Sequence, residues 1–150
     1  MSQSLSKMYI HVTYGTRFRK NLISRDFAPQ LHAYLAAVHK DQDCPALIIN
    51  SVPDHIHILF RMSKTVYLAD LIEHVKKNSS KWVKCQSFGS ESFYWQNGYG
   101  AFSISSSKVE SFRSYIKKQK EHHQNMSFEE EYKDMLKENN VEFDARYIWD

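Results

Sequence analysis

The chain has 150 residues, a hydrophobic fraction of 42% and a charged fraction of 25%, which are ordinary values for one folded domain. No apolar run reaches the ~18 residues of a membrane-spanning helix. The polar segment 1–7 lacks a signal-peptide core, so we expect a cytoplasmic protein. The net charge of +3 permits a polyanionic partner without requiring one.

Strand and helix patterns alternate along the first half of the chain. Apolar and polar residues alternate over 8–14, so Ile10 and Val12 share one face while His11 lies on the other. A short turn containing Pro53 separates two further strand patterns, which we therefore expect to pair as a hairpin. In chain order, we expect a strand over 8–14, a helix over 25–40, strands over 46–51 and 55–62, and an amphipathic helix over 66–86.

The second half is expected to add two short strands and two helices. Ser127, followed three residues later by Glu130, is a capping box and predicts a helix start. The expected elements are strands over 93–95 and 99–104, helices over 109–121 and 127–139, and an extended arm over 139–150. The order β-α-β-β-α-β-β-α-α predicts an α+β fold of ferredoxin-like or palm-like kind. It has an antiparallel sheet of four to five strands with helices packed on one face.

The stretch DHIHILF places two histidines on one strand. Alternation puts His55 and His57 on one face, and Ile56, Ile58 and Phe60 on the other. Two imidazoles at this spacing can chelate one divalent metal ion. Such a pair is also common as two polar residues on a solvated face. The pair by itself leaves both interpretations open.

A tyrosine and a glutamine lie one helical turn apart in the expected helix over 109–121. Tyr115 and Gln119 are at positions i and i+4, so they share one face of that helix. A deprotonated tyrosine is a nucleophile that forms a phosphotyrosine ester, and an amide oxygen can add a ligand to a metal site. The alternative is a partly buried tyrosine beside an ordinary amide.

Four motifs, in order, resemble one family. The stretches DHIHIL, SSKWV, FYWQNGYGAFSIS and YIKKQKEHH with the later FEEEY resemble the HUH-type single-tyrosine transposases of compact bacterial insertion sequences, including those associated with repetitive extragenic palindromes. The resemblance runs from the first strand to the ending ARYIW. It implies that residues 1–150 form a single HUH transposase domain.

The resemblance also implies a chemistry. It matches His55 and His57 to two metal ligands, Gln119 to a third ligand and Tyr115 to the nucleophile. The ion implied is Mg²⁺ or Mn²⁺, and the substrate is single-stranded DNA that carries a hairpin. Tyr115 would form a covalent 5′-phosphotyrosine link and release a 3′ hydroxyl, which later rejoins strands. Members are homodimers, in which the tyrosine helix serves its own site or its partner's.

Basic residues and histidines near these motifs are candidate DNA contacts. They are Arg17, Arg19 and Lys20 after the first strand, His11 on that strand, and Lys118 and His122 on the tyrosine helix. If the first and third strands are neighbours, His11 lies near the histidine pair and either contacts phosphate or is structural. The basic end of the tyrosine helix either contacts DNA or is a solvated terminus.

Two other functions compete with strand transfer. A two-histidine phosphoesterase needs two H-x-[ST] motifs, and the chain has only His11-Val12-Thr13. A domesticated, non-mobile family member would act as a hairpin-binding module without catalysis. The presence of His55, His57, Tyr115 and Gln119 argues against lost catalysis.

Overall fold

The computed structural model describes residues 2–86 and 92–149, apart from the side chain of His122. Its elements are β1 (Tyr9–Gly15), α1 (Ala28–Asp41), β2 (Ala46–Val52), β3 (His55–Arg61), α2 (Leu68–Lys84), β4 (Gly100–Ile104), α3 (Val109–Lys117), α4 (Gln119–His122) and α5 (Phe128–Glu138). Short 3₁₀ turns, η1 (Arg17–Arg19) and η2 (Ser106–Lys108), precede α1 and α3. Along the described ranges, no helix has both the length and the apolar composition needed to cross a membrane.

The strands form one antiparallel sheet in the order β2-β3-β1-β4. The expected hairpin of β2 and β3 is confirmed by their pairing, in which Asn50 lies opposite His57. Strand β1 lies on the other side of β3, with Thr13 opposite His57 and His11 opposite Leu59. The first strand is therefore a neighbour of the histidine strand.

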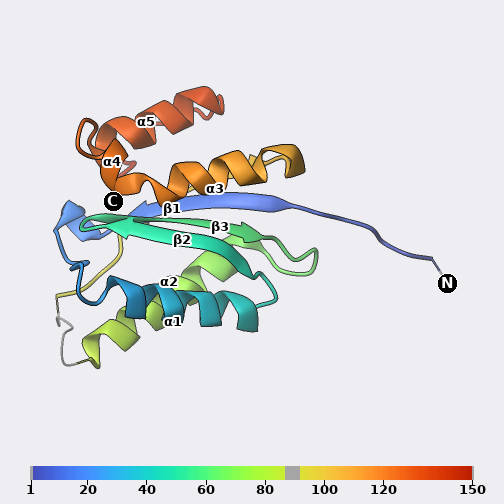
Figure 1. Ribbon diagram of the computed structural model, residues 1–150, viewed down its shortest axis with the longest axis horizontal. Coiled ribbons are helices and arrows are strands. Elements are labelled where there is room, and N and C mark those ends of the chain that lie inside the picture. Colours follow the sequence, from blue (N-terminus) through green and yellow to red (C-terminus); the bar gives the residue numbers. More distant parts are fainter. Residues whose placement is uncertain (1, 87–91, 150) are drawn as a thin grey trace.

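Helices cover both faces of this sheet, so the expectation of one covered face was wrong (Figure 1). Helices α1 and α2 lie on the face where Ile56 and Ile58 join the main apolar core. Helices α3, α4 and α5 lie on the opposite face, where Leu59 packs with Val109 and Ile116. The physical reason is that β3 is apolar on both faces, because Leu59 shares the histidine face and also needs burial.

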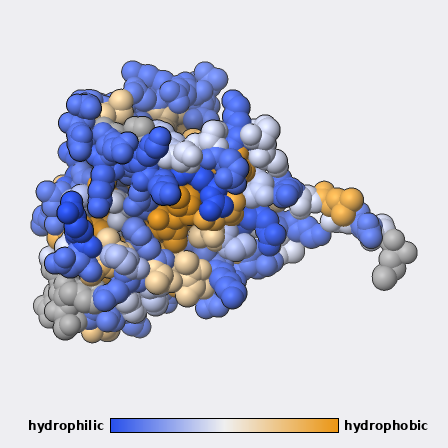
Figure 2. Space-filling view, viewed as in Figure 1, coloured by the Kyte–Doolittle hydropathy of each residue, from blue (hydrophilic) through white to orange (hydrophobic). Residues whose placement is uncertain are grey.

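The edge of the sheet at β2 is only partly covered. Residues 46–49 of this strand are half-buried, and they are mostly apolar. Figure 2 shows an apolar area, surrounded by a hydrophilic surface, where Figure 1 places β2.

The expected strand over 93–95 does not form, so the sheet has four strands in the described residues. Trp95 makes a single bridge to Thr16. Phe93 and Trp95 are nevertheless both buried, and the Trp95 indole N–H donates to Ser79 Oγ at 2.9 Å. The alternation over 93–95 resembled a strand because two aromatic side chains, two residues apart, are buried in the core.

The expected extended arm after Asn139 was also wrong. Its Trp149 ring lies 5.5 Å from Phe128 and 5.2 Å from Tyr132, measured between ring centroids. The arm therefore packs back onto α5, because three aromatic rings bury more apolar surface together than apart.

The expected helix over 109–121 is broken at Lys118, between α3 and α4. Lys118 has φ −96° and ψ 23°, outside the helical region. The Asn50 side-chain amide donates to the carbonyl oxygens of Ile116 at 2.9 Å and Lys117 at 3.2 Å. These carbonyls end α3 and need partners, so the β2 side chain stabilises the break. The expected start of α5 is confirmed, because Ser127 Oγ accepts a hydrogen bond from the Glu130 backbone N–H at 3.2 Å.

Lys76 of α2 holds the turn that precedes β4. Its ammonium donates to the carbonyl oxygens of Gln96 at 2.8 Å, Asn97 at 3.3 Å and Gly98 at 2.6 Å, and burial lowers its pKa to about 8. We expect Lys76→Ala to lower the free energy of unfolding by about 2 kcal/mol, because three carbonyls lose a charged donor. Urea unfolding measures this change. The exposed neighbour Lys77 is the control, and equal losses for Lys76→Ala and Lys77→Ala would contradict the prediction.

Candidate active site

The two histidines of β3 are fully buried and are oriented by neighbouring side chains. Asp54 Oδ1 lies 2.7 Å from His55 Nδ1, and His11 Nε2 lies 2.7 Å from His57 Nδ1. The imidazoles of His11 and His57 also stack, with centroids 5.0 Å apart. The Nδ1 atom of each β3 histidine thus contacts a neighbouring side chain, and this contact directs Nε2 of both rings toward α5.

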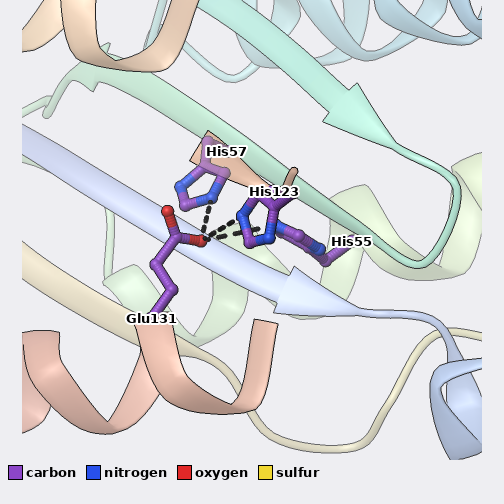
Figure 3. Close-up of side chains that lie close together, drawn as sticks. All are labelled: His55, His57, His123 and Glu131. Carbon is purple, nitrogen blue, oxygen red and sulfur yellow. Dashed lines mark hydrogen bonds and ion pairs between the residues drawn. The ribbon is translucent and has the colours of Figure 1, made fainter. Parts of the chain in front are cut away.

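Glu131 of α5 reaches these histidines from the helix that packs on their face of the sheet (Figure 3). Its Oε1 lies 3.0 Å from His57 Nε2, 3.0 Å from His123 Nε2 and 3.4 Å from His55 Nε2. Burial by itself raises the pKa of the Glu131 carboxyl, but the imidazoles of His123, His55 and His57 outweigh burial and hold that pKa far below its ordinary value. Glu131 is therefore a buried carboxylate surrounded by three imidazoles.

The second oxygen of the same carboxylate meets Tyr115 and Gln119. The Tyr115 hydroxyl donates a short hydrogen bond to Glu131 Oε2, and Gln119 Nε2 donates to it at 3.4 Å. Burial, and then the contact with Glu131, raises the pKa of Tyr115 well above its ordinary value. The resting tyrosine is therefore protonated. The structure brings all four residues of the expected site around one carboxylate.

The donor atoms of this cluster fit a divalent metal ion. His55, His57, His123 and Glu131 offer ligand atoms that all lie within 4.8 Å of one another. Two buried atoms at the cluster, His55 Nε2 and Gln119 Oε1, make no hydrogen bond. Both atoms are therefore available as ligands of a cation in addition to the atoms that Glu131 and His123 offer. Imidazole, carboxylate and amide oxygen are all ligands of Mn²⁺ and Zn²⁺, and the oxygens also suit Mg²⁺.

Sequence reasoning missed Glu131 and His123. The available signal for Glu131 was its position, because it falls on the buried stripe of α5 with Phe128, Tyr132 and Met135. A carboxylate on an apolar stripe needs a partner inside the protein. His123 follows α4 in a basic segment, and nothing in its surroundings distinguishes it from a solvated helix end.

The candidate DNA contacts lie in different settings. Arg17, Arg19 and Lys20 are exposed around η1, and Arg19 pairs with Glu129 of α5 at 3.4 Å. Lys118 is exposed at the break between α3 and α4. His11 is 1% exposed and supports His57, so the structure shows no path from it to DNA. The side chain of His122 lies outside the described residues, and the other assignments stay predictions.

A two-histidine strand covered by a tyrosine-bearing helix is the arrangement of an HUH-type transposase. The family described as "Transposase IS200 like" matches residues 4–119, and the chain belongs to that family. The matched segment contains His55, His57, Tyr115 and Gln119, whereas His123 and Glu131 lie beyond its end. A search of the curated proteins finds no match.

Two solved structures share this fold. One is a Deinococcus radiodurans protein described as a candidate transposase, with a TM-score of 0.59 and 17% identity over 79% of this chain and 98% of that chain. The other is a REP-associated tyrosine transposase bound to a REP hairpin, with a TM-score of 0.61 and 16% identity over 82% of this chain and 74% of that chain. At these identities the similarity supports the α+β fold with its antiparallel sheet.

Proposed function

We propose that this protein is a metal-dependent transposase that cleaves and rejoins single-stranded DNA at hairpin-bearing ends, with residues 1–150 acting as one domain. The observation that carries the proposal is the contact of the Tyr115 hydroxyl with the carboxylate that His55, His57 and His123 surround. Family membership supports the class of enzyme. The fold neighbour bound to a REP hairpin supports a hairpin substrate.

The metal ligands in this proposal are His55, His57 and Gln119, with His123 and Glu131 as further donors. A bound Mg²⁺ or Mn²⁺ ion would supply Lewis-acid stabilisation of the charge that develops on the phosphodiester. His11 and Asp54 position the two β3 histidines through their Nδ1 atoms.

The chemical step uses Tyr115 as the nucleophile, and the Glu131 carboxylate orients its hydroxyl through the hydrogen bond that it accepts. As the bond between the tyrosine oxygen and phosphorus forms, the bond from phosphorus to the 3′ oxygen breaks, which leaves a 5′-phosphotyrosine and a 3′ hydroxyl. The tyrosine proton passes to water, and the departing 3′ oxygen takes one proton from water, so the protons balance. Rejoining reverses these transfers with an incoming 3′ hydroxyl.

The test of the proposal is incubation with a hairpin-bearing single-stranded oligonucleotide and Mn²⁺, followed by a denaturing gel. A transferase gives a protein–DNA band that survives denaturation. A protein that shifts the hairpin on a native gel but never forms that band is a hairpin-binding module, and the transferase proposal then fails.

The tyrosine is proposed to serve the histidine cluster of its own chain, also within a homodimer. The supporting observation is that one chain supplies both Tyr115 and the cluster, in contact through Glu131. We expect a mixture of Tyr115→Phe and His57→Ala proteins to form no adduct, because neither chain holds a complete site. Denaturing gels of the mixture after co-refolding measure this. Recovery of the adduct in the mixture, with neither variant active alone, would show that the partner subunit supplies the tyrosine.

A further inference from the structure

The histidine cluster borders a second pocket, which His123 lines and Tyr115 does not. This pocket has a volume of about 660 Å³ and lies between the start of α1, the β2–β3 turn and α4. Its polar lining residues are Arg25, His32, Asn50, Ser51, Lys120, His123 and Gln124. His123 also contacts Glu131, so one side chain belongs to both the pocket wall and the cluster. A ligand in the pocket therefore lies next to the proposed metal site.

The charge of this pocket is opposite to that of the pocket beside Tyr115. The pocket lined by His123 carries the cations of Arg25 and Lys120, and we call it the cationic pocket. No carboxylate lies among its described lining residues. The pocket beside Tyr115 has a volume of about 540 Å³, and its lining contains four carboxylates: Glu121, Glu131, Asp134 and Glu138. A DNA strand is a polyanion, so the cationic pocket attracts it and the acidic pocket repels it.

The cationic pocket also has the size and surface for one nucleotide. Ligand pockets of small molecules span about 300–1,000 Å³ and combine an apolar wall with a few polar groups. Here Ile23, Val52 and Pro53 form an apolar wall. The His32 ring is held by Ser51 Oγ at 2.8 Å, and burial lowers the pKa of His32 to about 4. Neutral His32 therefore offers a flat ring for stacking, while Arg25 and Lys120 remain exposed for phosphate contacts.

We propose that this pocket binds one nucleotide of the single strand next to the scissile phosphodiester. Arg25 and Lys120 contact the phosphates on either side of the nucleotide, and its base lies against the apolar wall and His32. The strand then continues past His123 into the histidine cluster. This inference rests on the proposed function and adds the direction from which the strand enters.

The test measures binding of a short single-stranded oligothymidylate by fluorescence anisotropy, in the Tyr115→Phe protein without metal. We expect Arg25→Ala with Lys120→Ala to weaken binding by about tenfold at low salt. We also expect the slope of log affinity against log salt to fall by about 1.4, which corresponds to two lost single-strand phosphate contacts. The matched control replaces Lys77 and Lys81, two exposed cations of α2, by alanine. Its salt slope should differ less from the wild-type slope than that of the protein without Arg25 and Lys120.

A second variant separates the shape of the pocket from its charge. Gln124 is exposed at the pocket, so Gln124→Trp fills the space without removing a cation. We expect weaker binding with an unchanged salt slope, and a thermal melt verifies folding. Wild-type affinity in both pocket variants, or a larger loss in the α2 control, would overturn the proposal. If the pocket variants lose binding while the wild type forms no adduct, nucleotide binding by the pocket is supported and the transferase proposal fails.

Discussion

Replacing Tyr115 by phenylalanine is expected to abolish the covalent adduct with a hairpin-bearing oligonucleotide. The substitution removes the one oxygen that the proposed step joins to phosphorus. The ring itself keeps its packing, because Phe112 lies 5.3 Å and His57 6.3 Å from it between centroids. The fold should therefore survive with a loss of about 1–2 kcal/mol, from the hydrogen bond that Glu131 no longer accepts.

The measurement is the band on a denaturing gel with Mn²⁺, compared for three proteins. Tyr147→Phe is the matched control, because Tyr147 is 62% exposed and lies outside the site. Wild type and Tyr147→Phe should give the adduct, and Tyr115→Phe should give none above background. An undiminished band from Tyr115→Phe would show that another residue is the nucleophile.

Replacing His57 by alanine is expected to remove the stabilisation that Mn²⁺ gives the folded protein. An ion that binds only the folded state adds about 2.7 kcal/mol at a concentration one hundred times its Kd, and this raises Tm. His57 is fully buried and its Nε2 points at the cluster, so His57→Ala deletes one imidazole ligand of the proposed site. The readout is the metal-dependent rise in Tm, which is independent of catalysis.

Two further variants provide a control and an intermediate effect for this measurement. His74→Ala removes an exposed histidine of α2 and should keep the full rise in Tm. Glu131→Gln preserves size but removes the anionic donor, so the rise should shrink without vanishing. If His57→Ala gains as much from Mn²⁺ as the wild type does, the ion binds elsewhere and the proposed metal site is incorrect.

Local periodicity was enough to predict most of the elements. Alternation over DHIHILF identified β3 and put His55 and His57 on one face, because a strand has a period of two. The short turn at Pro53 was sufficient for the hairpin of β2 and β3. Ser127 identified the start of α5, because its side chain caps the first turn. Each of these features depends on residues that are close in sequence.

Other features depended on contacts between distant segments. Asn50 of β2 binds the last carbonyls of α3, so the break at Lys118 is stabilised by a residue 66 positions away from Ile116. The aromatic alternation of Phe93 and Trp95 was not followed by strand pairing, because those rings are anchored in the core. Helices cover both faces of the sheet because β3 carries apolar side chains on both of its faces.

By itself, the sequence determined the histidine pair, the Tyr115 and Gln119 pair and the strands and helices that carry them. The family resemblance implied that these two pairs form one site, and only the tertiary structure showed how they meet, with Glu131 between them. Glu131 is 74 residues from His57 in the sequence, and three successive glutamates at a helix start resemble a solvated face. The packing of α5 onto the histidine face buries one of the three, and that burial makes its carboxylate the link between the proposed nucleophile and the proposed metal ligands.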